Sequence, residues 1–200
     1  MDTNFCVRPF DLGIFGFVVM ALLTACGNSP AQQKIRPKHA EDAAQIRLSW
    51  YRKLVWPTED CPIDPLYEDN PGIETYFLKE NQTLVRVICT PGAYQRSSFL
   101  YWIHHGQAEL LHFRQFRDDG IHRSKFYTDP LLTGIIEIDT RHYVIKVWRK
   151  YRGIGDCGQL LRYRLSDGET SLLELRVKEC SDTPQPLPPE QWPKFPLSPP

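Results

Sequence analysis

The sequence predicts a mainly β protein: an antiparallel β-sandwich or an open, barrel-like meander of about eight strands, with one N-terminal helix. Short runs rich in aromatic and β-branched residues, separated by turn residues, dominate the chain after residue 55. Only one segment carries apolar residues at helical spacing. The 200 residues, 42% of them hydrophobic, are enough to build the core of one domain.

The helix is predicted over residues 40–54, AEDAAQIRLSWYRKL. Its first turn is acidic and its last turn is basic, as the helix dipole favours. Ala43, Ile46, Trp50 and Leu54 recur at helical spacing. These features predict the single helix of the domain.

Eight runs predict the strands. The connections between them are mostly short, so neighbouring strands should be antiparallel. No internal repeat and no heptad pattern is present. In chain order, the runs cover residues 72–78, 83–89, 97–105, 108–116, 134–138, 143–151, 159–165 and 170–179.

The N-terminus is typical of an exported protein. Residues 12–25 form an apolar stretch that is too short to span a bilayer and has the length of a signal-peptide core. The stretch ends in Leu23-Thr24-Ala25-Cys26, which resembles the bacterial lipobox, so Cys26 is the candidate site of lipidation. An ordinary cleaved signal peptide is the alternative. Nowhere are about 18 consecutive residues apolar, so we expect no membrane-spanning helix.

These features divide the chain into four parts. We expect a signal peptide (1–25), a lipidated cysteine with a flexible tether (26–42), a disulfide-braced β-domain (43–182) and a proline-rich tail (183–200). The tail also contains Leu187, Trp192 and Phe195, so part of it should lie against the domain. Localisation in the bacterial cell envelope follows, with a membrane as partner through the lipid anchor.

The folded region retains four cysteines, and in an exported chain this even number predicts two disulfides. Three connectivities are open. A hairpin around the turn at residues 166–169 would bring Cys157 close to Cys180, which leaves Cys61 to pair with Cys89. No CxxC spacing is present, so a cysteine zinc site is not expected.

Charge is balanced overall but uneven along the chain. The 24 basic and 24 acidic residues cancel, which argues against a nucleic-acid partner. Residues 141–164 are nevertheless strongly basic, and strand alternation predicts one basic face with an aromatic residue. This candidate binding surface suits an anionic glycan, a lipid headgroup or an acidic envelope protein, although the ordinary polar outer face of an antiparallel sheet is the simpler interpretation and the one we favour. Its residues are Lys146, Trp148, Lys150, Arg152, Arg162 and Arg164.

No catalytic motif emerges. The chain has no G-x-S-x-G elbow and no recognisable Cys–His signature. If Gly106-Gln107 is a hairpin turn, His105 and His112 lie about 13 Å apart along a strand and cannot share a metal ion. We therefore expect no cofactor and no metal, and a binding or envelope-maintenance module rather than an enzyme. The alternative is an envelope hydrolase with dispersed catalytic residues. The sequence gives no oligomeric state.

Three segments carry a resemblance to a known family: CTPGAYQ at residues 89–95, RGIGDCG at 152–158, and WPKFP at 192–196. Together they resemble an uncharacterised bacterial domain-of-unknown-function family, number 1176 of that series, whose exported members include cyanobacterial proteins. The resemblance implies an extracytoplasmic location and brings no activity. The glycines of 152–158 could form an anion-binding nest, but a tight turn that directs Cys157 to its disulfide partner is the interpretation we favour.

Overall fold

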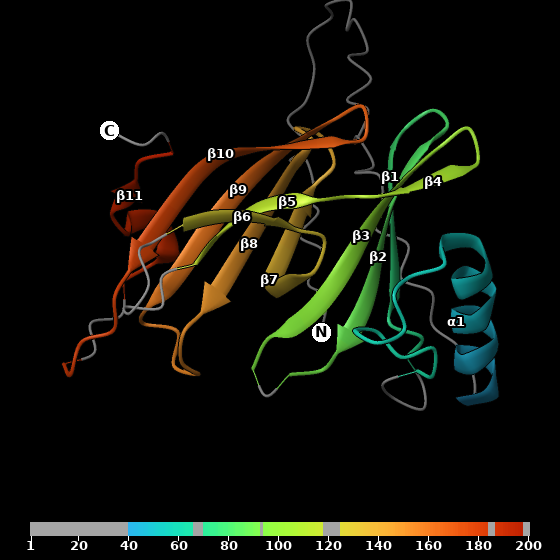
Figure 1. The fold of residues 1–200 in the computed structure, drawn as a ribbon, viewed down its shortest axis with the longest axis horizontal. Coiled ribbons are helices and arrows are strands. Elements are labelled where there is room, and N and C mark those ends of the chain that lie inside the picture. The colour runs from blue at the N-terminus through green and yellow to red at the C-terminus, as the bar shows by residue number, and fades with distance from the viewer. Residues whose placement is uncertain (1–39, 66–69, 93, 118–124, 184–186, 198–200) are drawn as a thin grey trace, which may run out of the picture.

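The computed structural model describes residues 40–65, 70–92, 94–117, 125–183 and 187–197. Within these ranges the chain is mainly β, with one α-helix and antiparallel strand pairs, so the predicted fold class is confirmed (Figure 1). The described strands form no closed barrel. The elements are α1 (Ala40–Leu54), β1 (Ile73–Lys79), β2 (Gln82–Thr90), β3 (Arg96–His104), β4 (Gln107–Leu110), β5 (Phe113–Arg117), β6 (Lys125–Asp129), β7 (Leu132–Asp139), β8 (Val144–Lys150), β9 (Gly158–Ser166), β10 (Glu169–Lys178), the 3-10 helix η1 (Pro189–Gln191) and β11 (Lys194–Phe195).

The main sheet forks along β3. Its strand order is β1-β2-β3-β7-β8-β9-β10-β11, with β4 also attached to β3. Residues 96–98 of β3 pair with β7, whereas residues 101–104 of the same strand pair with β4. The sheet therefore divides into two wings, β1–β4 and β7–β11, which share only the first part of β3 (Figure 1).

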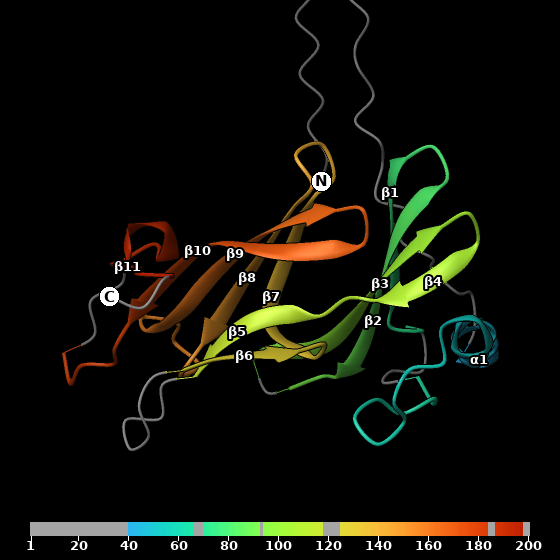
Figure 2. The same ribbon diagram turned by 45° about the horizontal axis from the view of Figure 1, so that its top comes forward.

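A separate hairpin, β5–β6, lies across one face of the second wing (Figure 2). The chain turns from β4 into this hairpin at Leu111, which is buried and donates its N–H to the carbonyl of Leu100 at 2.9 Å. The Phe113 ring packs edge-on against Tyr163 of β9, with ring centroids 5.1 Å apart. The predicted single strand over residues 108–116 is thus two strands, because a buried residue redirects the chain.

The larger core fills the space between this hairpin and the inner face of the sheet. Strand side chains alternate between faces, so residues 161, 163 and 165 of β9 point into this core while 160, 162 and 164 point to the outer face. On the first wing, Leu84, Leu100 and Trp102 belong to the same core. The two wings therefore share one apolar interior.

A second core lies on the opposite face of the first wing, beneath α1. Val85, Val87, Phe99 and Tyr101 pack there with Leu54 and residues just after the helix. The helix has the predicted bounds. These two cores position the first wing rigidly, because both of its faces are covered.

Arg47 is fully buried beside this second core, although arginine is almost never fully buried without partners. Its guanidinium donates hydrogen bonds to the carbonyls of Pro62, at 2.7 and 3.1 Å, and of Pro71, at 2.8 Å. It also lies over the Trp56 ring, 5.1 Å from the centroid. Burial lowers the pKa of Arg47 to about 10. The helix is therefore tied to the segment that leads into β1.

The C-terminal tail lies on the domain, as its apolar residues suggest. Trp192 is fully buried and its indole N–H donates to the carbonyl of Leu187 at 3.1 Å. The short strand β11 pairs with β10, and Phe195 packs against Phe116 of the hairpin. Although the segment is rich in proline, it contains η1, which begins with a proline, and β11, which lies between two prolines.

Candidate functional site

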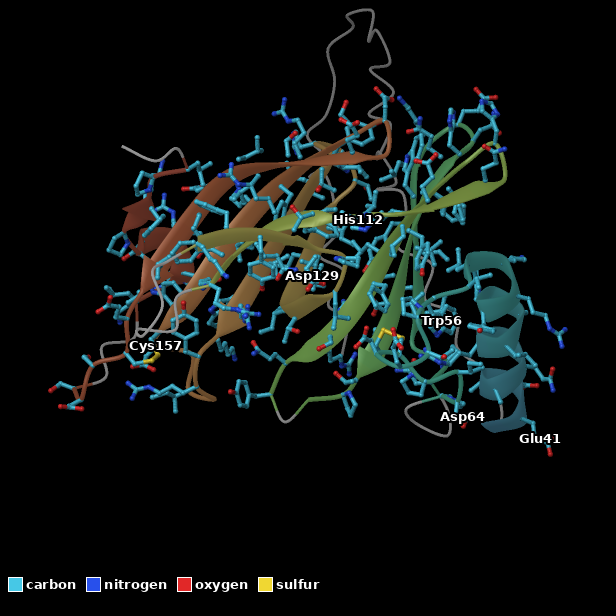
Figure 3. The ribbon with its side chains drawn as sticks, in the orientation of Figure 1. Glu41, Trp56, Asp64, His112, Asp129 and Cys157 are labelled. Carbon is cyan, nitrogen blue, oxygen red and sulfur yellow. A yellow bond between two sulfur atoms is a disulfide. The ribbon has the colours of Figure 1, made fainter. Side chains whose placement is uncertain are left out.

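Two disulfides brace the domain (Figure 3). One joins Cys61 to Cys89, with Cα atoms 4.3 Å apart, and the other joins Cys157 to Cys180, with Cα atoms 5.0 Å apart. These are the two pairs that the hairpin argument favoured. Such bonds are typical of oxidising environments outside the cytoplasm. Cys26 lies outside the described residues, and α1 does not have the length and apolarity to cross a membrane.

The predicted basic surface lies on the outer face of the second wing, opposite the core. Lys146, Trp148 and Lys150 share this face of β8, and Lys146 stands directly opposite Arg162 of β9. Arg164 extends the same face by one step along β9. The structure therefore brings five of the six predicted residues together.

Acidic side chains compensate much of this basic face. Lys146 lies 2.7 Å from Glu137 and 2.8 Å from Glu190, and hydrogen bonds to these two carboxylates raise the pKa of Lys146. Arg162 pairs with Glu174 at 3.0 Å. Lys150 lies over the Trp148 ring instead, 4.6 Å from the centroid. The face thus keeps only part of its positive charge, and sequence reasoning missed the compensation because the carboxylates come from other strands and from the tail.

Arg152 does not join that face, because it lies beyond the end of β8 in the turn that contains Cys157. Its Nε atom donates to Asp156 at 2.8 Å, and its terminal nitrogen donates to the carbonyl of Ser181 at 2.9 Å. Hydrogen bonding from Arg152 lowers the pKa of Asp156. Gly158 has a φ of +147°, and a Cβ there would meet the carbonyl oxygen of Arg149 at 2.1 Å. The glycines therefore serve a tight turn beside the disulfide.

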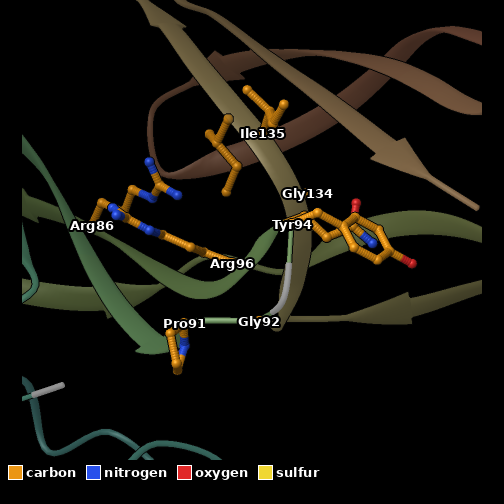
Figure 4. A pocket seen from close by; sticks show the side chains of 9 residues that line it. Arg86, Pro91, Gly92, Tyr94, Arg96, Gly134 and Ile135 are labelled. Atoms are coloured by element: carbon orange, nitrogen blue, oxygen red, sulfur yellow. The ribbon is translucent and has the colours of Figure 1, made fainter. Parts of the chain in front are cut away.

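A pocket of about 400 Å³ opens where β2, β3 and β7 meet, just beyond the larger core (Figure 4). The loop between β2 and β3 forms one of its sides, and the start of β7 forms another. Its lining combines basic, aromatic, apolar and glycine residues. They are Arg86, Pro91, Gly92, Tyr94, Gln95, Arg96, Gly134, Ile135 and Ile136.

The side chain of Gln95 and the glycine at position 92 determine the conformation of the loop that forms one side of the pocket. The Gln95 carboxamide donates to the carbonyl of Lys150 at 3.2 Å and accepts from the N–H of Lys150 at 2.9 Å. A Cβ on Gly92, where φ is +55°, would meet the carbonyl oxygen of Gln95 at 1.7 Å, so the loop requires glycine there. The loop is thereby fixed to the end of β8, next to the turn of residues 152–158.

Two arginines give the pocket its charge. Arg86 is buried; its Nε donates to Ser98 Oγ at 3.0 Å and its Nη1 pairs with Glu74 at 3.1 Å. Tyr76 donates to the same carboxylate at 2.9 Å, and burial followed by the charge of Glu74 raises the pKa of Tyr76. Arg96 is half-buried and has no hydrogen-bond or ion-pair partner for its guanidinium among the described residues. The pocket thus holds one positive charge without a counter-ion.

Sequence reasoning missed this pocket. Residues 89–95 were singled out only for the family resemblance. Arg86 lies between buried apolar residues of β2. A charged residue within such an apolar strand was the one feature of the sequence that could have indicated the pocket. The residues that line the pocket come together only because strands far apart in the sequence pair with one another. Local sequence patterns do not show such pairing.

The histidine geometry differs from the prediction. The hairpin turn is His105-Gly106, with φ values of 48° and 79°, so His104 stands opposite Gln107. This is the two-residue turn in which both central residues have positive φ, and it favours glycine in second place. The rings of His104 and His105 lie 4.1 Å apart rather than diverging. In the described ranges, no group of three or more His, Cys, Asp or Glu residues is placed to hold a metal ion.

Comparison with known proteins gives one match. A family model described as protein of unknown function (DUF1176) matches residues 23–196. The matched region includes Cys26, all four disulfide cysteines and the whole pocket. No curated protein and no solved structure matches the chain.

Proposed function

The chain belongs to DUF1176, a family of proteins of unknown function, and on that premise we propose that it is a lipid-anchored protein of the bacterial cell envelope that acts by binding. The location rests on Cys26 and the disulfides. Cys26 directly follows an apolar segment of signal-peptide length and the residues Leu23-Thr24-Ala25. Each buried CH₂ of an acyl chain contributes about 0.8 kcal/mol, so several chains on one cysteine hold a protein at a membrane.

The observation that carries the binding role is the open pocket between β2, β3 and β7. It is largely preformed, because Gln95 and Arg86 are both held by hydrogen bonds within the domain. A concave site with a few convergent polar groups is the usual form of a ligand site.

The carboxylates with shifted pKa values are engaged in structural contacts. Four described carboxylates have shifted pKa values, and all four are lowered by hydrogen-bonding or cationic partners; they are Asp139, Asp156, Glu174 and Glu190. A general acid at neutral pH needs the opposite shift. These carboxylates therefore serve structural pairs.

The anchor is tested by labelling bacteria that express the full chain with radioactive palmitate. The wild-type protein and the control variant Cys6→Ser, which changes a cysteine ahead of the apolar segment, should both take up label. Cys26→Ser should take up none. Label on Cys26→Ser, or its absence from all three proteins, would contradict the anchor.

A further inference from the structure

We propose that the pocket between β2, β3 and β7 binds an oxyanion, the phosphate or carboxylate group of a small ligand, through the guanidinium of Arg96. This names the ligand class of the binding role proposed above. It does not depend on the lipid anchor.

The two arginines of the pocket lie on the same face of the sheet. Arg96 and Ser98 are two residues apart on β3, so their side chains share a face, and Arg86 reaches Ser98 from β2. Figure 4 shows the Arg86 and Arg96 side chains extending along one wall of the pocket. Glu74 compensates Arg86 alone. The guanidinium of Arg96 is therefore half-buried beside the charged Arg86. No carboxylate among the described residues balances its charge.

A bound oxyanion would balance the positive charge of Arg96 and match the geometry of its guanidinium group. Guanidinium presents paired N–H donors in a rigid fork that binds carboxylate and phosphate through two parallel hydrogen bonds. Ser98 and Glu74 fix Arg86, so that Arg86 contributes a constant positive field while Arg96 is available for contact. This division of roles favours an anion at Arg96.

The remainder of the pocket sets the size and character of the ligand. Its volume of about 400 Å³ lies within the range of small-molecule sites. Ile136 provides apolar surface on the face of the arginines, and Tyr94 provides an aromatic surface. We therefore expect a ligand with one oxyanion and a compact, partly apolar body.

The experiment is an NMR titration of the mature full chain, purified in detergent, that follows the backbone amides of Gly92, Gln95 and Gly134. Inorganic phosphate probes a free oxyanion, and glycerophosphoglycerol probes the headgroup of an anionic lipid. Both should shift these amides saturably. Tighter binding of glycerophosphoglycerol would identify a lipid headgroup as the source of the anion, whereas equal or tighter binding of phosphate would identify a free oxyanion.

Variants identify the residue responsible. Arg96→Gln should weaken phosphate binding at least about tenfold, which corresponds to about 1.4 kcal/mol. Arg96→Lys, which keeps the charge but loses the fork, should bind with intermediate affinity. The matched control Arg52→Gln removes an exposed arginine in the last turn of α1, far from the pocket lining, and should leave affinity unchanged.

Two results would overturn the inference. One is a wild-type protein whose pocket amides do not shift with either probe. The other is an Arg96→Gln protein with a well-dispersed spectrum that binds phosphate as tightly as wild type. Palmitate labelling is unaffected by either result, so a failed anion site and a failed anchor are distinguishable.

Discussion

The side chain of Gln95 exchanges two hydrogen bonds with the main chain of Lys150, 55 positions further along the sequence. The carboxamide pairs with both backbone groups of one residue, as a neighbouring strand would, because it has both a hydrogen-bond donor and an acceptor. This contact joins the β2–β3 loop to the end of β8. It holds residues 89–95 next to the start of the segment 152–158, so two of the three segments that carry the family resemblance lie close together.

Replacing Gln95 should therefore weaken the domain. Gln95→Met keeps the length of the side chain but removes both hydrogen bonds, so we expect the free energy of unfolding to fall by about 1–2 kcal/mol. Urea denaturation followed by circular dichroism measures this. The control is Gln107→Met in the exposed strand β4. An equal loss of unfolding free energy in both variants would show that the hydrogen bonds between Gln95 and Lys150 are not the cause.

Arg47 should be among the most sensitive positions of the helix. Arg47→Met leaves the carbonyls of Pro62 and Pro71 without their donors, the second of them buried, and we expect a loss of about 3 kcal/mol in the free energy of unfolding. Arg52→Met, in the exposed last turn of the same helix, should cost little. Similar thermal unfolding of both variants would refute the anchoring role of Arg47.

Asp156 should contribute to the loss of stability of the domain at acidic pH. Its pKa is lowered in the folded state, chiefly by the hydrogen bond from Arg152, from a usual value of 3.8. The group binds protons more readily when unfolded, so its contribution is complete above pH 3.8 and is lost as the pH falls through the lower folded pKa. Asp156→Asn should therefore show a shallower loss of stability below pH 4 than wild type. A pH series of denaturation curves checks this, with the exposed Asp60→Asn as control.

The disulfides should be present in the exported protein and should matter for its stability. Peptide mapping without reduction is expected to recover Cys157 linked to Cys180. On the chain-entropy estimate, a bridge that closes a 23-position loop contributes about 3 kcal/mol. Free thiols at both positions in protein isolated from the envelope would contradict the pairing.

Local patterns predicted most of the elements. The helix over residues 40–54 was predictable because its charges and apolar spacing agree, and the strand runs because their apolar and turn residues alternate clearly. The strand β6 was not, since residues 125–129 have no clear apolar alternation and are placed by pairing with β5. The break at Leu111 depends on a hydrogen bond to the neighbouring strand β3.

The candidate site was less predictable than the fold. The alternation of β8 and β9 correctly grouped Lys146 and Arg162, but Glu137 and Glu174, which neutralise them, lie on other strands. Arg96, on the inner face, has no acidic partner among the described residues, and the sequence did not single it out. Its isolation depends on which carboxylates the folded sheet brings near, and no local spacing contains that information.

The intact mass of the membrane-associated protein tests the central claim, that the chain is anchored by lipid at Cys26, most directly. Expressed at full length in a bacterial host, the product should have the mass of a chain that begins at Cys26 with acyl groups added. An unmodified chain cleaved at another position would contradict the lipid anchor and favour a freely diffusing exported protein.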